Sequence, residues 1–368
     1  MNIFFYDNFS SSYNRFGNRV AEKLVRRNSK IKIFYIHDNY DRKKLLLSKE
    51  IENNVIAIQP SRVQDFVQEY PPSSFLCFSY RIPDMYWTTF FNKIDVPTYQ
   101  VMHGIYVKTY KRNFAFLLKE LPRIASYLKY LFKIILLCDN KKQVIINLVK
   151  KDLAYIKESN KVDQDTLSNT LILWGIHWKQ WFQKNYGYNE KNNYEVCGSF
   201  DLALLQDSEN LIEHEQDSIT YIAQTIAEDG RIKDSYFYEF LDNLEKLINK
   251  NSWHLYIKLH PRSNQKYYTA FEKYENVTIT SKFPISEMYI THYSALLTVP
   301  LHLRKKIVMV QFPDHPIPNE YAYMSPNILG HDQTIEISKI QHSQGDFGKY
   351  FAPIEDPHDK VAQIITSN

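Results

Sequence analysis

Short apolar runs that alternate with polar, helix-like stretches constrain this 368-residue chain more than any other feature. Within the first hundred residues, strands of a buried parallel sheet are predicted at 3–6, 31–36, 55–58, 75–78 and 98–102. Helices are predicted between them at 15–26 and 61–69, and Ser61 is expected to cap the second helix. This alternation is typical of an open α/β sheet, whose ligands lie outside the carboxyl ends of the strands.

The same alternation starts again after residues 206–218, an acidic and amide-rich segment. Further strands are predicted at 170–174, 194–197, 219–223, 253–259, 277–279, 287–290 and 306–311, and helices at 235–249, 295–303 and 359–365. We therefore predict an N-terminal α/β domain at 1–205, a linker at 206–218 and a C-terminal α/β domain at 219–368. Two such domains are expected to face each other across a cleft that binds the ligand.

Composition excludes several classes of site. The chain has only 9 glycines, and none are spaced as in the glycine-rich loops of dinucleotide-binding or P-loop proteins. Cys77, Cys138 and Cys197 lie far apart, so neither a disulfide framework nor a zinc site is expected. The one D-x-D, at 163–165, lies in a polar segment and not at a strand end, so no metal is expected. No signal peptide or spanning segment is predicted, which favours a cytoplasmic location.

Residues 108–151 carry eleven basic and two acidic side chains, a local charge of +9 in a chain whose total is +4. Apolar residues recur there at helical spacing, which predicts basic amphipathic helices over 108–157. One interpretation is attachment to the anionic inner leaflet of the plasma membrane, each basic side chain contributing on the order of 1 kcal/mol. The other is an ordinary core-facing helix with a solvated basic face. Nucleic acid is not expected, because no known binding motif accompanies the charge.

Three short motifs fall at strand ends of the C-terminal half. His260, Pro261 and Arg262 follow the strand at 253–259, where the imidazole and the guanidinium could bind a phosphate. The other interpretation is a strand-terminating turn with a surface histidine.

Glu228 and Asp229 precede Gly230 just after the first strand of this half. Adjacent carboxylates resist joint ionisation, so the pKa of one is expected to be raised, as suits a general base. An ordinary acidic turn is the alternative.

The third motif, Thr291, Tyr293 and Ser294 around His292, opens a predicted helix. Its hydroxyl and backbone N–H groups could bind an anion, or Thr291 and Ser294 could serve only as caps. In the N-terminal half, His103 and Gly104 follow the strand at 98–102. His103 could bind the acceptor or the phosphate, or be a packed loop residue. Asp7, after the first strand, is a weaker candidate for the acceptor side.

The motifs occur in the order Glu228-Asp229-Gly230, His260-Pro261 and a hydroxyl-rich stretch at 291–294. This order resembles that of bacterial sialyltransferases of the GT-B type, particularly the lipooligosaccharide sialyltransferase family. The likeness covers about 219–311. It implies a GT-B fold of two Rossmann-like domains and an inverting, metal-independent transfer of sialic acid, or a related sugar acid, from a CMP-activated donor to a hydroxyl of lipooligosaccharide or capsule. No cofactor beyond the donor substrate is implied.

The resemblance also implies roles for the motif residues. Asp229 or Glu228 would be the base on the acceptor hydroxyl, His260 would stabilise the departing CMP phosphate, and Thr291 with Ser294 would bind it. Segments 100–104 and 290–294 also look like the teichoic-acid glycerophosphotransferases and the capsule Kdo transferases, so CDP-glycerol and CMP-Kdo are alternative donors. A non-enzymatic membrane-surface module, with the segment 108–151 as its working part, is the third hypothesis.

Overall fold

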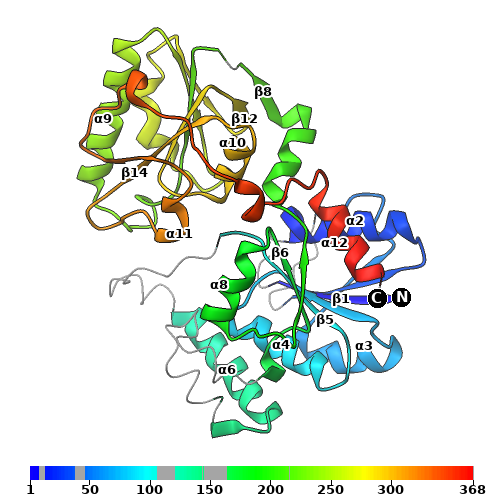
Figure 1. The fold of residues 1–368 in the computed structure, drawn as a ribbon. Coiled ribbons are helices and arrows are strands. Elements are labelled where there is room, and N and C mark those ends of the chain that lie inside the picture. Colours follow the sequence, from blue (N-terminus) through cyan, green and yellow to red (C-terminus); the bar gives the residue numbers. More distant parts are fainter. Residues whose placement is uncertain are drawn as a thin grey trace. The chain divides into compact units, whose positions relative to one another are not determined.

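The computed structural model describes residues 1–7, 13–37, 46–105, 121–142, 144, 164–214 and 216–367. These residues form two compact units, each built on its own parallel sheet (Figure 1). Unit 1 is drawn from residues 1–103, 118–200 and 348–368, and unit 2 from residues 104–117 and 201–347. The predicted α/β class is confirmed for both units.

The sheet of unit 1 has seven strands in the order β3-β2-β1-β4-β5-β6-β7, and every pairing is parallel. The strands are β1 (Asn2–Tyr6), β2 (Lys32–Ile36), β3 (Val55–Ile58), β4 (Ser74–Cys77), β5 (Thr98–Val101), β6 (Thr170–Leu173) and β7 (Asn193–Val196). The helices are α2 (Asn18–Arg27), α3 (Val63–Glu69), α4 (Ile82–Asn92), α6 (Leu121–Leu137), α8 (His177–Tyr186) and α12 (Pro357–Thr366). Continuous apolar runs form the central strands because helices cover both of their faces.

The main sheet of unit 2 has six parallel strands in the order β11-β10-β9-β13-β14-β15. They are β9 (Ser218–Ile222), β10 (His254–Lys258), β11 (Val277–Thr280), β13 (Met288–Thr291), β14 (Lys306–Gln311) and β15 (Asn327–Gly330). A small second sheet pairs β8 (Leu211–Glu213) with β12 (Phe283–Ile285). The helices are α9 (Asp234–Lys250), α10 (Thr298–His302) and α11 (Asn319–Ala322).

Both main sheets reverse their winding next to their first strand. In unit 1 the chain passes from β1 outward to β2 and β3, and returns to β4 on the other side of β1. In unit 2 it passes from β9 to β10 and β11, and returns to β13 on the other side of β9. Ligands of open α/β sheets bind outside the carboxyl ends of the strands at such a switch point. The edges after β1 and after β9 are therefore the places to look for sites.

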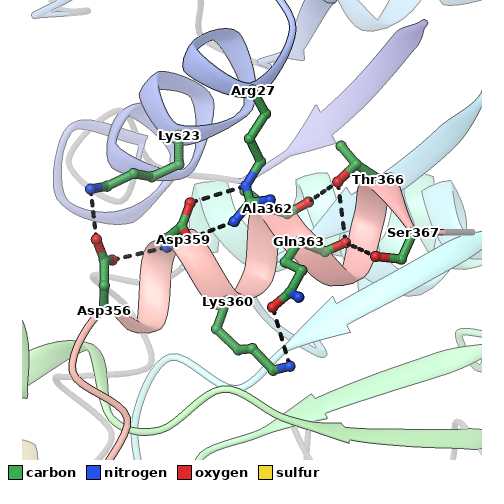
Figure 2. Close-up of polar contacts among 9 residues, drawn as sticks. All are labelled: Lys23, Arg27, Asp356, Asp359, Lys360, Ala362, Gln363, Thr366 and Ser367. Atoms are coloured by element: carbon green, nitrogen blue, oxygen red, sulfur yellow. Dashed lines mark hydrogen bonds and ion pairs between the residues drawn. The ribbon is translucent and has the colours of Figure 1, made fainter.

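The strands were predicted more accurately than the boundaries between the two domains. Residues 348–368 belong to unit 1, although the sequence placed them in the C-terminal domain. Helix α12 packs against α2, where the carboxylate of Asp359 accepts two hydrogen bonds from Arg27 at 2.6 and 3.0 Å (Figure 2). The predicted linker at 206–218 contains β8, which is part of unit 2.

Two local predictions need correction. Ser61 does not cap α3, because a short 3₁₀ turn at Pro60–Arg62 precedes the helix and Arg62 occupies the cap position without a side-chain hydrogen bond. The helix predicted at 295–303 is a 3₁₀ turn at Ala295–Leu297 followed by α10. Pro300 lies in the first turn of α10, where a missing N–H breaks no hydrogen bond of the helix.

Of the basic segment 108–157, the structure describes α6 and residues as far as 144, and the rest of the predicted helices lie outside the described residues. Tyr130 and Ile134 lie on the buried face of α6, which packs against α4, and Cys138 is buried just after the helix. None of the helices in the described ranges has the length and apolar character needed to span a membrane.

Candidate functional site

The acidic pair lies in a turn at the carboxyl end of β9. Ile226 and Ala227 are buried in the core of unit 2 and hold the start of this turn. The backbone N–H of Asp229 donates to the carbonyl of Thr225 at 2.9 Å, and Gly230 follows with a φ of +65°. That left-handed conformation favours glycine. The turn thus places both carboxylates at the edge where ligands bind.

The His-Pro motif forms a second turn at the carboxyl end of β10. The N–H of Ser263 donates to the carbonyl of His260 at 2.8 Å, with Pro261 in the second position of this β-turn. The N–H of Arg262 donates to Nδ1 of His260 at 3.1 Å. Because Nδ1 accepts a hydrogen bond, it carries no proton, and the hydrogen of the neutral ring lies on Nε2. His260 therefore presents an N–H donor at Nε2.

The structure brings these two turns together, because β9 and β10 are neighbouring parallel strands. The Arg262 guanidinium donates from Nη1 to Oδ1 of Asp229 at 3.0 Å and from Nη2 to the hydroxyl oxygen of Thr225 at 2.9 Å. The N–H of Asn264 donates to Oε1 of Glu228 at 3.0 Å. The expectation that the acidic pair and the histidine share one edge of the sheet is met within unit 2.

The expected raised pKa is wrong for Asp229. Partial burial raises the pKa of this carboxyl, but the hydrogen bond from Arg262, the charge of Arg231 and the hydrogen bond from Thr225 together lower it below its usual value. The opposite charges of the two arginines outweigh the neighbouring acid. Asp229 is therefore ionised throughout the neutral range and is a weak base.

Glu228 faces the interior. Its Oε2 atom is buried and accepts no hydrogen bond within the described residues. Burial and then the charge of Glu228 raise the pKa of the Tyr268 hydroxyl, which lies behind the turn. Glu228 thus has one buried oxygen, Oε2, and one oxygen, Oε1, that bonds to the turn after β10.

The third motif is largely part of the core. Thr291 is fully buried, and its hydroxyl donates to the carbonyl of Ile222 on β9 at 3.2 Å. Contrary to expectation, this hydroxyl does not lie where a phosphate could reach it. His292 is also buried, between the carbonyl of Val310 and the hydroxyl of Tyr221. Burial lowers the pKa of His292 to about 3, so its ring is neutral.

Ser294 acts as a cap, since its hydroxyl accepts a hydrogen bond from the N–H of Leu296 at 3.2 Å. Tyr293, at the switch point, stacks on His315 with ring centroids 5.0 Å apart. The side-chain amide of Gln224, after β9, bonds to both the carbonyl and the N–H of Tyr293. It thereby joins the loops on the two sides of the switch point.

Sequence reasoning missed three residues of this edge: Gln224, Arg231 and His315. Arg231 follows the acidic turn and donates from Nη2 to Oδ2 of Asp229 at 3.0 Å. Burial and the Arg231 charge lower the pKa of His315 to about 4. A second His-Pro pair, His315-Pro316 after β14, was a sequence signal that could have located this corner of the sheet.

The candidate acceptor residues lie at the ends of β1 and β5. Asp7 is buried, and its N–H donates to the Tyr13 hydroxyl oxygen at 2.8 Å. His103 is half-buried, with its ring 5.9 Å from that of Phe16. Gly104 has no positive φ and open space where a β-carbon would lie, so this position does not require glycine.

Sequence reasoning also missed Asp84, at the start of α4. It is fully buried, and Oδ2 accepts a hydrogen bond from the N–H of Arg81 at 3.1 Å. Burial raises the pKa of Asp84 to about 7; the Arg81 charge opposes this rise and the Asp7 charge adds to it. Two interacting buried carboxyls thus lie at the switch-point edge of unit 1.

Among the residues that the structure describes, no group of three or more His, Cys, Asp or Glu side chains is arranged to hold a metal ion.

The fold of the chain is that of known two-domain sugar enzymes. The UDP-GlcNAc 2-epimerase of Methanocaldococcus jannaschii matches over 100% of both chains with a TM-score of 0.56 and 11% identity. The UDP-GlcNAc 2-epimerase of Neisseria meningitidis, bound to UDP-GlcNAc, also matches over 100% of both chains, with a TM-score of 0.52 and 12% identity. The wall teichoic acid polymerase TagF matches over 100% of this chain and 88% of its own, with a TM-score of 0.53 and 13% identity.

These similarities show that the chain has the GT-B fold, with two Rossmann-like α/β domains. No family model matches the sequence, and no curated protein matches it. The resemblance to sialyltransferases therefore rests on the motifs alone.

Proposed function

We propose that this protein is a glycosyltransferase that binds a nucleotide-activated sugar donor at the carboxyl edge of the unit 2 sheet. The observation that carries the proposal is the junction of the two turns after β9 and β10, where Arg262 bonds to Asp229 and Thr225 beside the His260 ring. Cationic and neutral N–H donors gather there at a sheet edge that binds ligands in α/β proteins. The GT-B fold of enzymes with UDP-GlcNAc and CDPG in their structures supports the same conclusion.

The proposed reaction is a displacement at the anomeric carbon of the donor sugar. The bond from this carbon to the phosphate oxygen breaks, a bond to the acceptor hydroxyl oxygen forms with inversion, and the hydroxyl proton is released to water. The nucleotide leaves with a negative charge on its phosphate. The Nε2–H of His260 and the guanidinium of Arg262 would stabilise this charge, since N–H donors aimed at a developing anion are worth about 3–4 kcal/mol each.

For the donor we propose CMP-activated sialic acid or a related sugar acid, because the order of the acidic pair and the His-Pro turn is that of the lipooligosaccharide sialyltransferases. The acceptor would be a hydroxyl of a cell-surface glycan, with Asp7, His103 and Gly104, which follow β1 and β5, as its candidate contacts. The alternatives are CDP-glycerol, which the fold of TagF favours, and CMP-Kdo. UDP-GlcNAc is a further candidate donor, because two epimerase structures of similar fold contain it.

The test is nucleotide release from CMP-sialic acid, CMP-Kdo, CDP-glycerol and UDP-GlcNAc, each with a galactose-terminated oligosaccharide or lipooligosaccharide acceptor. We expect release with one of the cytidine donors and a loss of about 10²-fold or more in His260→Ala. His302→Ala, which removes an exposed histidine of α10, is the matched control and should keep full activity. Full activity in His260→Ala would contradict the proposed site.

We also propose that α6 binds an anionic membrane surface. Leu128, Phe132 and Leu136 recur every four residues, so they share one side of the helix, and each is more than half exposed. An apolar stripe opposite the buried face of a helix marks an interaction surface. Lys129 is exposed beside the stripe, and Lys141 and Lys142 are exposed just after the helix. Apolar insertion flanked by lysines fits anionic lipid.

This proposal is tested by co-sedimentation with phosphatidylglycerol-containing vesicles and with phosphatidylcholine vesicles. We expect binding to the anionic vesicles only, weakened about tenfold by Phe132→Asp, since a buried Phe contributes roughly 1.5–3 kcal/mol. Leu46→Asp, at another exposed leucine of unit 1, is the control. Dimerisation without vesicle binding would contradict a lipid partner. Vesicle binding without nucleotide binding would favour a non-enzymatic surface module.

A further inference from the structure

The carboxylate of Asp229 accepts four hydrogen bonds, three of them from arginines. Oδ2 accepts from the hydroxyl of Thr225 and from Nη2 of Arg231, both at 3.0 Å. Arg262 donates to Oδ1 from Nη1 at 3.0 Å and to Oδ2 from Nη2 at 3.4 Å. Oδ2 thus accepts from three donors and Oδ1 from one, so this carboxylate is engaged mainly with Thr225 and the two arginines.

The two arginines, in contrast, have donors to spare. Each guanidinium carries about five N–H groups. Asp229 and Thr225 take some of those of Arg262, and Asp229 and the Tyr293 hydroxyl take some of those of Arg231. The side chains of Arg262 and Arg231 are 63% and 46% exposed, while that of Asp229 is 18% exposed. The part of the cluster that faces solvent is therefore cationic, and the carboxylate lies beneath it.

The charge and place of this cluster fit a phosphate group. Two guanidiniums on one carboxylate leave one positive charge within this side-chain cluster. Glu228, next to Asp229, bonds instead to the N–H of Asn264 through Oε1. The cluster lies at the carboxyl ends of neighbouring strands, beside the Nε2–H of His260. Guanidinium groups recognise phosphate oxygens through paired, charge-assisted hydrogen bonds.

We propose that Asp229 is a positioning residue that anchors Arg231 and Arg262 as a clamp for the phosphate of a nucleotide, and that it is not the proton acceptor of the reaction. This inference rests on the proposed function, because the nucleotide of the activated sugar is the ligand. It adds Arg231 to the site and replaces the role that the motif resemblance implies for Asp229.

The first test measures binding of CMP, UDP and pyrophosphate by calorimetry to the whole protein. We expect Arg231→Gln and Arg262→Gln each to weaken binding of at least one of these probes by about tenfold or more. Lys246→Gln, which removes an exposed charge of α9 without a partner in the clamp, should leave binding unchanged. Wild-type affinity in both arginine variants, or no binding of any of the three probes to the wild type, would overturn the clamp.

The second test separates an anchor from a base through Asp229→Asn, assayed with whichever of the four donors above is turned over. An anchor predicts a raised KM for the donor, a kcat within about tenfold of wild type and an unchanged pH profile of kcat. A base predicts a kcat lowered by about 10³-fold at an unchanged KM, which would overturn the inference. The arginine variants change exposed side chains, so they decide the question if Asp229→Asn does not fold.

The two tests also keep this inference apart from the proposed function. If pyrophosphate binds through both arginines while no nucleotide or donor is bound or turned over, the clamp stands and the proposed function falls. If a donor is turned over and both arginine variants behave as wild type, the proposed function stands and the clamp falls.

Discussion

The carboxyl group of Asp84, in unit 1, has a raised pKa that makes the stability of the protein depend on pH. Its pKa in the folded protein is about 7, against 3.8 as the ordinary value, mainly because burial disfavours the charged form. The native state therefore holds this proton more tightly than the unfolded chain does. The resulting stability is fully present below about pH 4 and is lost as the pH rises through 7.

Replacement Asp84→Asn should remove this cost of burying a charge. We expect the free energy of unfolding to rise by about 1–2 kcal/mol at pH 8, within an upper limit of about 4 kcal/mol set by the pKa difference, and to change little at pH 4. Urea unfolding at both pH values measures the difference. A change of equal size at the two pH values would show that packing, and not ionisation, is responsible.

At the residue scale, the sequence located residues that follow the ends of strands, but it could not show in which direction their side chains point. His260 and Asp229 share one edge because parallel neighbours carry their following turns to the same side. Thr291 was assigned to that edge by position, but its side chain turns toward β9. Arg231 belongs to no motif, and its charge adds to the hydrogen bond from Arg262 in reversing the expected pKa shift of Asp229.

At the element scale, ion pairs between residues far apart in the sequence join α12 to α2 (Figure 2). Asp356 caps α12 by accepting a hydrogen bond from the N–H of Asp359 at 2.9 Å, and it pairs with Lys23 at 2.6 Å. Partial burial raises the pKa of Asp356, but the Lys23 and backbone hydrogen bonds outweigh this and lower it. The stability gained is present at neutral pH and lost as the pH falls below about 4.

We expect Asp356→Ala to destabilise the protein by about 1–2 kcal/mol at pH 7, because it removes a helix cap and an ion pair together. Lys360→Ala on the same helix is the control, with an expected effect within about 0.5 kcal/mol. Both are measured by denaturant unfolding. Equal effects of the two substitutions would mean that neither the cap nor the ion pair contributes.

Most strands could be predicted, whereas α4, α8 and β15, and the grouping of the elements into units, were not. Continuous apolar runs located nearly every strand, because a strand buried on both faces needs apolar residues throughout. Nothing local in residues 348–368 indicates that α12 joins unit 1, since that choice depends on contacts with Lys23 and Arg27. Long-range pairs of this kind have no sequence periodicity.

At the scale of the whole molecule, the two sheets repeat one plan, with strands that wind outward in both directions from β1 and from β9. Alternating apolar and polar segments predict such sheets. The GT-B fold was implied by the motif resemblance and is shown by the solved structures. Structures matched at 11–13% identity include enzymes named for UDP-GlcNAc and for teichoic acid, so the fold alone does not identify a ligand.

The central claim is that the turn after β10 holds a nucleotide donor in unit 2. Its most direct test is the melting temperature of the wild type and of His260→Ala with CMP-sialic acid, CMP-Kdo, CDP-glycerol and UDP-GlcNAc, because a ligand at about 100 times its Kd adds about 2.7 kcal/mol of stability. We predict that one cytidine donor raises the melting temperature of the wild type and raises that of His260→Ala much less. An equal rise in both proteins, or no rise with any donor, would contradict the claim.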